Sequence, residues 1–162
     1  MANESYLVRG TPIVWSDSGA DLVITLNNLA TVTGRVGARK DWGASPQPAY
    51  FIWRFTCQFE TAPVVGESIG IYLAWSDGTE EDGQVGTADA ALSALNKVKN
   101  LHRIGSLIVD VATVDIDFTA SGECVMPDRY SSPVIVNNTV DNLQATANTS
   151  TFTMTPVYWQ TQ

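Results

Sequence analysis

Apolar and polar residues alternate along most of the chain with a period of two. The clearest example is one face of the segment 50–59, which carries Phe51, Trp53, Phe55, Cys57 and Phe59. This alternation is typical of β-strands that are buried on one side. The same period recurs in four further segments, which are 22–26, 69–75, 104–118 and 152–158. We expect the longest of them, 104–118, to bend or break.

Turn-forming residues separate these runs and divide the chain into short strands, roughly eight to ten in number. Only the segment 88–99 has apolar residues at helical spacing. Thr87 is its expected N-cap, and Asp89 lies in the expected first turn, where the helix dipole favours an acid. We therefore predict a short helix there, about one to three turns long.

This pattern predicts an all-β fold, a jelly-roll-like antiparallel β-sandwich with one short helix. An immunoglobulin-type sandwich needs about 100 residues and seven strands. This chain has 162 residues, so the eight strands of a jelly roll suit it better. A closed β-barrel is the alternative. We expect residues 1–162 to form a single domain, with an extended loop or arm at 37–49 that contains Pro46 and Pro48.

Composition and charge exclude several classes of protein. The chain has 44% hydrophobic and only 16% charged residues, which argues against intrinsic disorder. Nine basic residues stand against 17 acidic ones, and the net charge of −8 argues against nucleic-acid binding. No apolar run reaches the length of about 18 residues that a membrane span needs. The N-terminal sequence MANESYLVRG has no basic region followed by an apolar run, so we expect no secretory signal.

The search for catalytic or metal-binding motifs yields little. His102 is the single histidine, at the start of an expected strand, and we expect it to lie on the surface. One histidine and two cysteines do not form a structural zinc site without carboxylates. We therefore predict no enzyme activity, no metal and no cofactor. Cys57 is expected to be buried and inert, and a disulfide between Cys57 and Cys124 remains an open alternative.

The acidic loop 77–83 holds four carboxylates in six residues. Clustered carboxylates suit a calcium ion, and a pair of them suits glycoside hydrolysis. The spacing does not match the EF-hand pattern, and no strand fixes the separation of a pair. We favour a solvated loop whose like charges keep it extended.

Tryptophans and basic residues provide the best candidates for partner binding. Trp53 and Trp75 fall on apolar strand faces and are expected in the core, so Trp42 and Trp159 remain as the candidates for exposure. The residues proposed to bind a partner lie close together in the sequence and are Arg35, Arg39, Lys40 and Trp42. We predict a polarised molecule, with the acidic loop facing solvent and this basic segment facing an acidic partner surface.

Several motifs together resemble a known family. They are 55–67 (FTCQFETAPVVGE), 71–79 (IYLAWSDGT), 86–89 (GTAD), 100–107 (NLHRIGSL), 130–134 (YSSPV) and 152–158 (FTMTPVY). They resemble a family of small β-sandwich virion proteins of tailed bacteriophages, the capsid decoration or cement proteins. The resemblance covers about residues 50–158, rests on structural motifs, and carries no site residue to this chain.

The resemblance implies a structural virion protein that binds the outside of a phage capsid and stabilises it by bridging subunits of the major capsid protein. It implies localisation in the virion after assembly in the host cytoplasm, and a homo-oligomer, expected to be a trimer. The partner would be protein, and neither nucleic acid nor membrane. The alternative is a tail-associated receptor- or carbohydrate-binding module, for which the five tryptophans are the motive.

Overall fold

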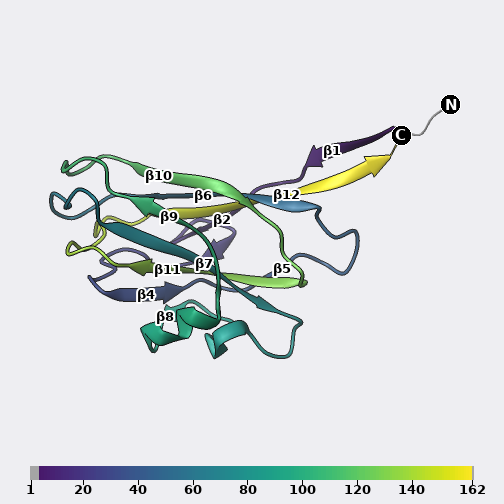
Figure 1. The fold of residues 1–162 in the computed structure, drawn as a ribbon, viewed down its shortest axis with the longest axis horizontal. Helices are drawn as coiled ribbons and strands as arrows, with labels where there is room; N and C mark the ends of the chain where they lie inside the picture. Colours follow the sequence, from purple (N-terminus) through teal and green to yellow (C-terminus); the bar gives the residue numbers. More distant parts are fainter. Residues whose placement is uncertain (1–3, 162) are drawn as a thin grey trace.

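Two β-sheets face each other in the structure, a computed structural model that describes residues 4–161 (Figure 1). The first sheet contains, in spatial order, β10 (Phe118–Cys124), β6 (Tyr50–Cys57), β12 (Thr151–Thr161), β2 (Ile13–Ser16) and β3 (Leu22–Val23), with β1 (Ser5–Arg9) also paired to β12. The second contains β8 (Ala90–Ala91), β4 (Thr33–Val36), β11 (Tyr130–Asn137), β7 (Ser68–Ser76) and β9 (His102–Ile108), with β5 (Lys40–Asp41) also paired to β11. Within 4–161, only the pairing of β2 with β3 is parallel.

The strand order is that of a jelly roll. Strands β2, β12, β6 and β10 lie side by side in the first sheet, and β4, β11, β7 and β9 lie side by side in the second. Between consecutive members of these eight strands, the chain therefore crosses from one sheet to the other at every link except that from β7 to β9. This is the double-sheet arrangement of eight antiparallel strands that defines a jelly roll. The predicted all-β sandwich is confirmed.

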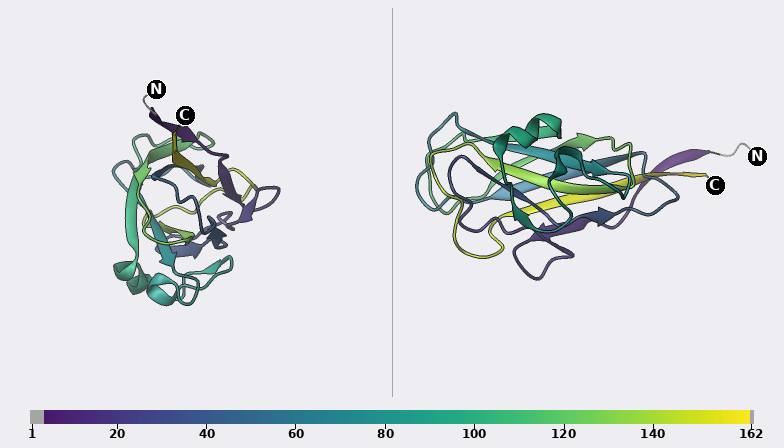
Figure 2. Two further views of the ribbon diagram at one scale, coloured as in Figure 1. Left: turned by 90° about the vertical axis from the view of Figure 1, so that its right-hand side faces the viewer. Right: turned by 90° about the horizontal axis from the view of Figure 1, so that it is seen from below.

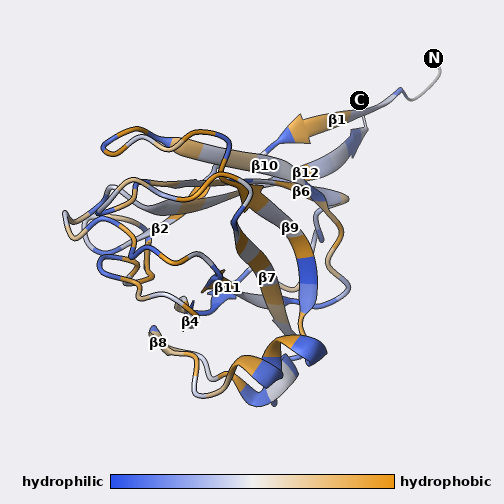
Figure 3. Ribbon diagram, turned by 60° about the vertical axis from the view of Figure 1, so that its left-hand side comes forward, coloured by the Kyte–Doolittle hydropathy of each residue, from blue (hydrophilic) through white to orange (hydrophobic). Residues whose placement is uncertain are grey.

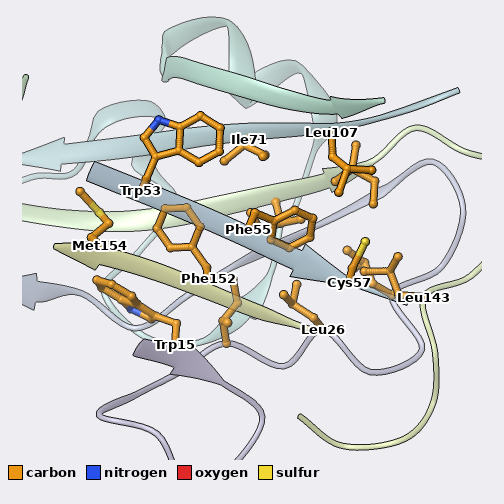
Figure 4. Packing of buried hydrophobic residues seen from close by; sticks show 14 of the residues in the cluster. Trp15, Leu26, Trp53, Phe55, Cys57, Ile71, Leu107, Leu143, Phe152 and Met154 are labelled. Atoms are coloured by element: carbon orange, nitrogen blue, oxygen red, sulfur yellow. The ribbon is translucent and has the colours of Figure 1, made fainter. Parts of the chain in front are cut away.

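Alternating side chains from the two sheets form the core (Figure 4). On β6, Phe51, Trp53, Phe55 and Cys57 are buried, and the intervening residues are half-buried or exposed. They meet side chains of the opposite sheet such as Ile71, and the neighbouring β12 adds Phe152 and Met154. The period of two in the sequence thus identified the inward face of β6 correctly.

The long apolar run at 104–118 breaks, as predicted. β9 ends at Ile108, and β10 begins in the other sheet at Phe118. Asp115 in the connecting loop has a φ of 57°, a left-handed conformation that stops a strand. One periodic sequence segment therefore supplies a strand to each sheet.

The predicted helix at 88–99 is wrong in its first half. Ala90 and Ala91 form β8, which pairs with β4, and a six-residue 3-10 helix follows at η2 (Leu95–Asn100). A second 3-10 turn, η1, covers Asp82–Gln84. The residue that precedes η2 is Ala94, so Thr87 is no N-cap. No α-helix is present among the described residues.

The apolar spacing in this region has a different cause. Its apolar side chains pack on a small second cluster, formed by Val36, Ala74, Val134 and Val136 on the second sheet. The side chains that cover the cluster include Leu92, Leu95 and Val98. Figure 3 shows the mixed hydropathy of the 3-10 turns beside the sheet. The apolar spacing in 88–99 therefore predicted correctly that one side of the segment is buried, but it did not predict the backbone conformation.

The segment 37–49 is only partly the loop that the sequence predicts. Lys40 and Asp41 form β5 and pair with Ser131 and Tyr130 on β11. Trp42 follows directly and is buried. Residues 43–49 form the remaining loop, which contains no strand. The first part of the expected arm is therefore integrated into the second sheet.

Candidate partner-binding surfaces

The four residues predicted to bind a partner lie along one stretch of chain beside β11, but they have different environments. Arg35 belongs to β4, Lys40 belongs to β5, and Arg39 and Trp42 lie next to β5. Arg39 lies over Tyr130 and Lys40 lies over Trp42, whereas Arg35 is held elsewhere by an acidic partner. The predicted set therefore divides into one structural residue and a surface group.

Arg35 is held in an ion pair with Asp89. Its Nε donates to Asp89 Oδ1 at 2.7 Å, and its Nη2 donates to Oδ2. Thr25 donates to the same carboxylate from its backbone N–H at 3.0 Å and from its hydroxyl at 2.6 Å. Burial raises the pKa of Asp89, but the hydrogen bonds from Arg35 and Thr25 outweigh it and hold this pKa below its usual value. Arg35 therefore fastens β4 to two loops.

Arg39 and Arg129 both lie against the ring of Tyr130. Their guanidinium carbons are 4.6 Å and 5.0 Å from the ring centroid, within the range of cation–π attraction. Arg39 also donates to Glu81 at 2.7 Å. Arg129 forms a two-pronged pair with Asp41 at 2.6 Å and 2.5 Å. The hydrogen bonds from Arg129, together with the backbone N–H of Gly43, lower the pKa of Asp41 to about 2.

Lys40 differs from these arginines because it forms no ion pair with any residue in 4–161. Its ammonium lies 5.8 Å from the ring centroid of Trp42. We call Arg39, Lys40, Arg129 and Tyr130 the basic surface. Its three cations exceed the carboxylates of Asp41 and Glu81 by one charge, and Lys40 carries that excess.

The expected exposure of Trp42 is wrong. Only 8% of this residue is exposed, and its indole N–H donates to Ser131 Oγ at 2.9 Å. Its ring meets Phe51 edge-on at 4.6 Å and Trp15 at 6.3 Å. Trp42 therefore anchors β5 to the core, and the ammonium of Lys40 lies over its ring. Trp42 is not exposed for contact with a partner protein.

The predicted separation of acidic and basic regions is also wrong. Glu81 of the acidic loop pairs with Arg39, so the loop lies against the basic surface. Asp77 accepts the backbone N–H of Thr79 at 2.8 Å, which lowers its pKa. Asp82 accepts the backbone N–H of Trp75 at 3.3 Å. Within 4–161, no cluster of three or more histidine, cysteine or acidic residues suits a metal ion.

Most of the remaining single residues lie where the sequence predicts, and Trp75 is the exception. His102 is exposed at the start of β9, with its ring centroid 4.5 Å from that of Trp75. Trp53 is buried, whereas Trp75 is only half-buried. Cys57 and Cys124 are both buried and free, so no disulfide forms between them. Burial raises the pKa of both thiols, that of Cys124 to about 12.

A second candidate surface was not predicted from the sequence. Strand β1 pairs with the last five residues of β12, and the two strands project from the sandwich as a ribbon (Figures 1 and 2). We call Ser5–Arg9 with 157–161 the terminal ribbon. Leu7 and Trp159 are opposite partners in it and are 43% and 64% exposed. The exposure predicted for Trp159 is confirmed, and the short run Tyr6-Leu7-Val8 was the signal that the sequence offered for its partner strand.

A pocket of about 240 Å³ connects the two surfaces. Its lining comes from β5, from the base of the terminal ribbon and from the link to β2, and comprises Gly10, Thr11, Ile13, Lys40, Asp41, Trp42, Pro156 and Tyr158. Lys40, which carries the excess positive charge, therefore lies close to the base of the terminal ribbon.

Comparisons with known proteins add no further assignment. No protein-family model matches this chain, and the search of curated proteins finds no relative of it. Between residues 4 and 161, no helix has the length and apolar character needed to cross a membrane.

Proposed function

We propose that this protein is a structural virion protein that binds the outside of a phage capsid and stabilises it by bridging subunits of the major capsid protein. The observation that carries the proposal is the basic surface. On a chain with a net charge of −8, Arg39 and Arg129 lie against the ring of Tyr130, and Lys40 lines a pocket that Asp41, the partner of Arg129, also lines. The motif resemblance to capsid decoration proteins gives this surface its expected partner.

The physical mechanism is binding linked to assembly. A protein that binds the assembled shell, and not its separated subunits, shifts the equilibrium toward the shell by mass action. Lys40 and the two tyrosine-bound arginines would meet acidic groups of the capsid protein, and such contacts raise the rate of association more than the final affinity. The jelly-roll sandwich supplies a rigid support, because Trp42 fixes β5 to the core.

The experiment measures binding to mature capsids that lack this protein, by co-sedimentation and by association kinetics at several salt concentrations. Lys40→Glu should lower the association rate roughly ten-fold at low salt, and the difference should shrink as salt screens the charges. Lys99→Glu is the matched control, since Lys99 is exposed on η2, away from the basic surface. Arg35 is unsuitable for this test because its loss would disturb the fold.

Two results would overturn the proposal. One is wild-type protein that does not bind mature capsids. The other is virions without the protein that resist heat and low ionic strength as well as complete virions do. Copy number in purified virions gives an independent measure, because a shell repeats its sites by symmetry and should hold on the order of hundreds of copies.

A tail-associated receptor- or carbohydrate-binding module remains the alternative proposal. This alternative was based on the five tryptophans of the sandwich, of which three are buried and Trp75 is half-buried. Trp159 alone is exposed, and a single ring offers a small platform for a sugar. A copy number of about a dozen or fewer, as expected at the single symmetry axis of a tail, would favour this alternative over the shell.

A further inference from the structure

Five exposed valines lie in four loops that meet at one end of the sandwich. The loops are 24–32, 58–67, 109–117 and 138–150, and Figure 1 shows them at the end away from the terminal ribbon. Each of the five side chains is between 40% and 63% exposed. We call these residues the valine patch: Val32, Val64, Val65, Val111 and Val140. Single exposed apolar residues are ordinary, but a contiguous apolar patch on a surface marks an interaction site.

Hydrogen bonds between the loops bring these valines together. Gly66 donates its N–H to the carbonyl of Val109 at 2.9 Å, which joins the second loop to the third. Val140 donates its N–H to the carboxylate of Glu67, also at 2.9 Å, which joins the fourth loop to the second. The second loop, with its two valines, therefore lies between the loops that carry the others.

Val32 joins the patch through Thr31, whose hydroxyl donates to the carbonyl of Thr139 at 2.5 Å. Val32 has a φ of 53°, in the left-handed region where a β-branched residue is strained. Its side chain is also 61% exposed, so burial within the chain does little to offset this strain. A contact with another molecule would bury the side chain, and backbone strain of this kind clusters at binding sites.

The charge of this end indicates the chemistry of that molecule. Loop 17–21 belongs to the same end, since Asp17 accepts the N–H of Asn148 at 3.1 Å. The five loops contain eight acidic residues and no basic one, and the rest of the chain contains nine of each. The whole net charge of −8 is therefore at this end, and within 4–161 none of the eight acids takes part in an ion pair. They are Asp17, Asp21, Glu60, Glu67, Asp110, Asp115, Asp117 and Asp141.

We propose that the valine patch binds a segment of a second protein in which lysine or arginine side chains flank apolar ones. The apolar side chains of the segment cover the valines and supply affinity, and its cations lie against the surrounding carboxylates and raise the association rate. The same carboxylates repel nucleic acid, anionic membranes and the equivalent end of another copy of this chain.

The valine patch is separate from the basic surface. Lys40 pairs with Ser131 near the start of β11, whereas the fourth loop begins after Asn137 at the end of that strand. Between Ser131 and Asn137 the strand rises about 20 Å, at about 3.4 Å per residue. A molecule that binds a capsid through its basic surface would keep the valine patch free for another partner. The inference therefore goes beyond the proposed function and does not depend on it.

The test measures the binding of short synthetic peptides to the full chain by fluorescence anisotropy at low salt. The probe peptide alternates lysine with leucine. One comparison peptide has serine in place of leucine, and the other has glutamate in place of lysine. The probe should bind at least roughly ten-fold more tightly than either, because the site needs both cations and apolar side chains. No detectable binding of the probe would overturn the proposal, and so would equal binding of the lysine–serine peptide.

Val32→Asn distinguishes recognition from stability. Asparagine tolerates a positive φ better than valine, so the midpoint of unfolding should rise. The probe should nevertheless bind roughly five-fold more weakly, because an apolar contact is lost. Val125→Asn is the matched control, since Val125 is an exposed valine that follows β10 at the other end of the sandwich, and it should leave probe binding unchanged. Equal probe binding by Val32→Asn and the wild type would overturn the assignment of the patch.

Asp110→Lys tests the contribution of charge. Asp110 is exposed beside Val111, so the reversal should weaken probe binding roughly five-fold at low salt and less at high salt. Glu123→Lys changes the net charge equally at an exposed position near the far end of β10 and should have a much smaller effect. Equal effects would overturn the proposal, because net charge alone would then attract the probe. Protein that binds the probe but not capsids would remove only the capsid role.

Discussion

Replacement of Trp53 by alanine should destabilise the sandwich by about 3–5 kcal/mol. Trp53 is 3% exposed on β6, opposite Gly122 of β10 and Met154 of β12. A buried tryptophan removes about 150–250 Å² from water, which corresponds to about 4–6 kcal/mol. Its indole N–H has no hydrogen-bond partner, so its removal relieves a penalty of about 1 kcal/mol. The difference gives the expected loss.

The assay is urea unfolding at fixed protein concentration, with the free energy of unfolding taken from the linear region. Trp53→Phe fills part of the site without the N–H and should lose only about 1 kcal/mol. Val125→Ala, at an exposed position, should change the free energy by less than about 0.5 kcal/mol. A loss below about 1 kcal/mol for Trp53→Ala would refute the assignment of this ring as a main support between the sheets.

Two further predictions follow from close packing and from charge. A Cβ added to Gly105 would meet the ring of Trp53 at 2.6 Å, so Gly105→Ala should lower the unfolding midpoint, and an unchanged midpoint would show that the ring can move aside. Because the pKa of Asp41 falls from 3.8 to about 2, the stability due to its pairing is complete above pH 3.8 and is lost as the pH falls through 2. The carboxyl carbon shift of Asp41 should titrate near 2 in the wild type and nearer 3.8 in Arg129→Gln; equal midpoints would exclude that pairing as the cause.

The sequence predicted most of the sandwich because burial follows a simple rule in strands. Alternate side chains of β6 point inward, so a list of apolar residues identifies the buried face without knowledge of the neighbouring strands. The break within 104–118 was also predictable, since one strand of that length would exceed the usual dimensions. The number of strands predicted a jelly roll, but the sequence did not show which strand pairs with which.

The region 88–99 shows where this reasoning ends. A spacing of three and four fits a helix, but it also fits a chain that wraps over an apolar patch with irregular turns. Ala90 and Ala91 have strong helix propensity, yet the open edge of β4 offers them main-chain hydrogen bonds. Asp89, expected in the first turn of a helix, instead neutralises Arg35. Tertiary contacts thus outweighed local preference.

The basic segment shows the same limit for sites. Arg35, Arg39 and Lys40 are close in sequence, but their acidic partners are 54 residues away for Arg35 and 42 for Arg39. Such distant pairs leave no local signal, so the sequence alone counted three available cations where the structure leaves one. Arg129, which completes the basic surface beside Tyr130, comes from a distant part of the chain for the same reason.

The pocket between β5 and the terminal ribbon determines how the basic surface must be tested. Tyr158 and Pro156 cover Gly10 so closely that a Cβ there would meet them at 2.9 Å and 3.0 Å, which fixes the base of the ribbon. Lys40 lines the same pocket, so a change at the base would disturb both surfaces. Leu7 lies three residues further along β1 and is absent from that lining. Leu7→Ala should therefore leave the rate of association with capsids unchanged while Lys40→Glu lowers it, and an equal loss in the two variants would show that the terminal ribbon and the basic surface form one site.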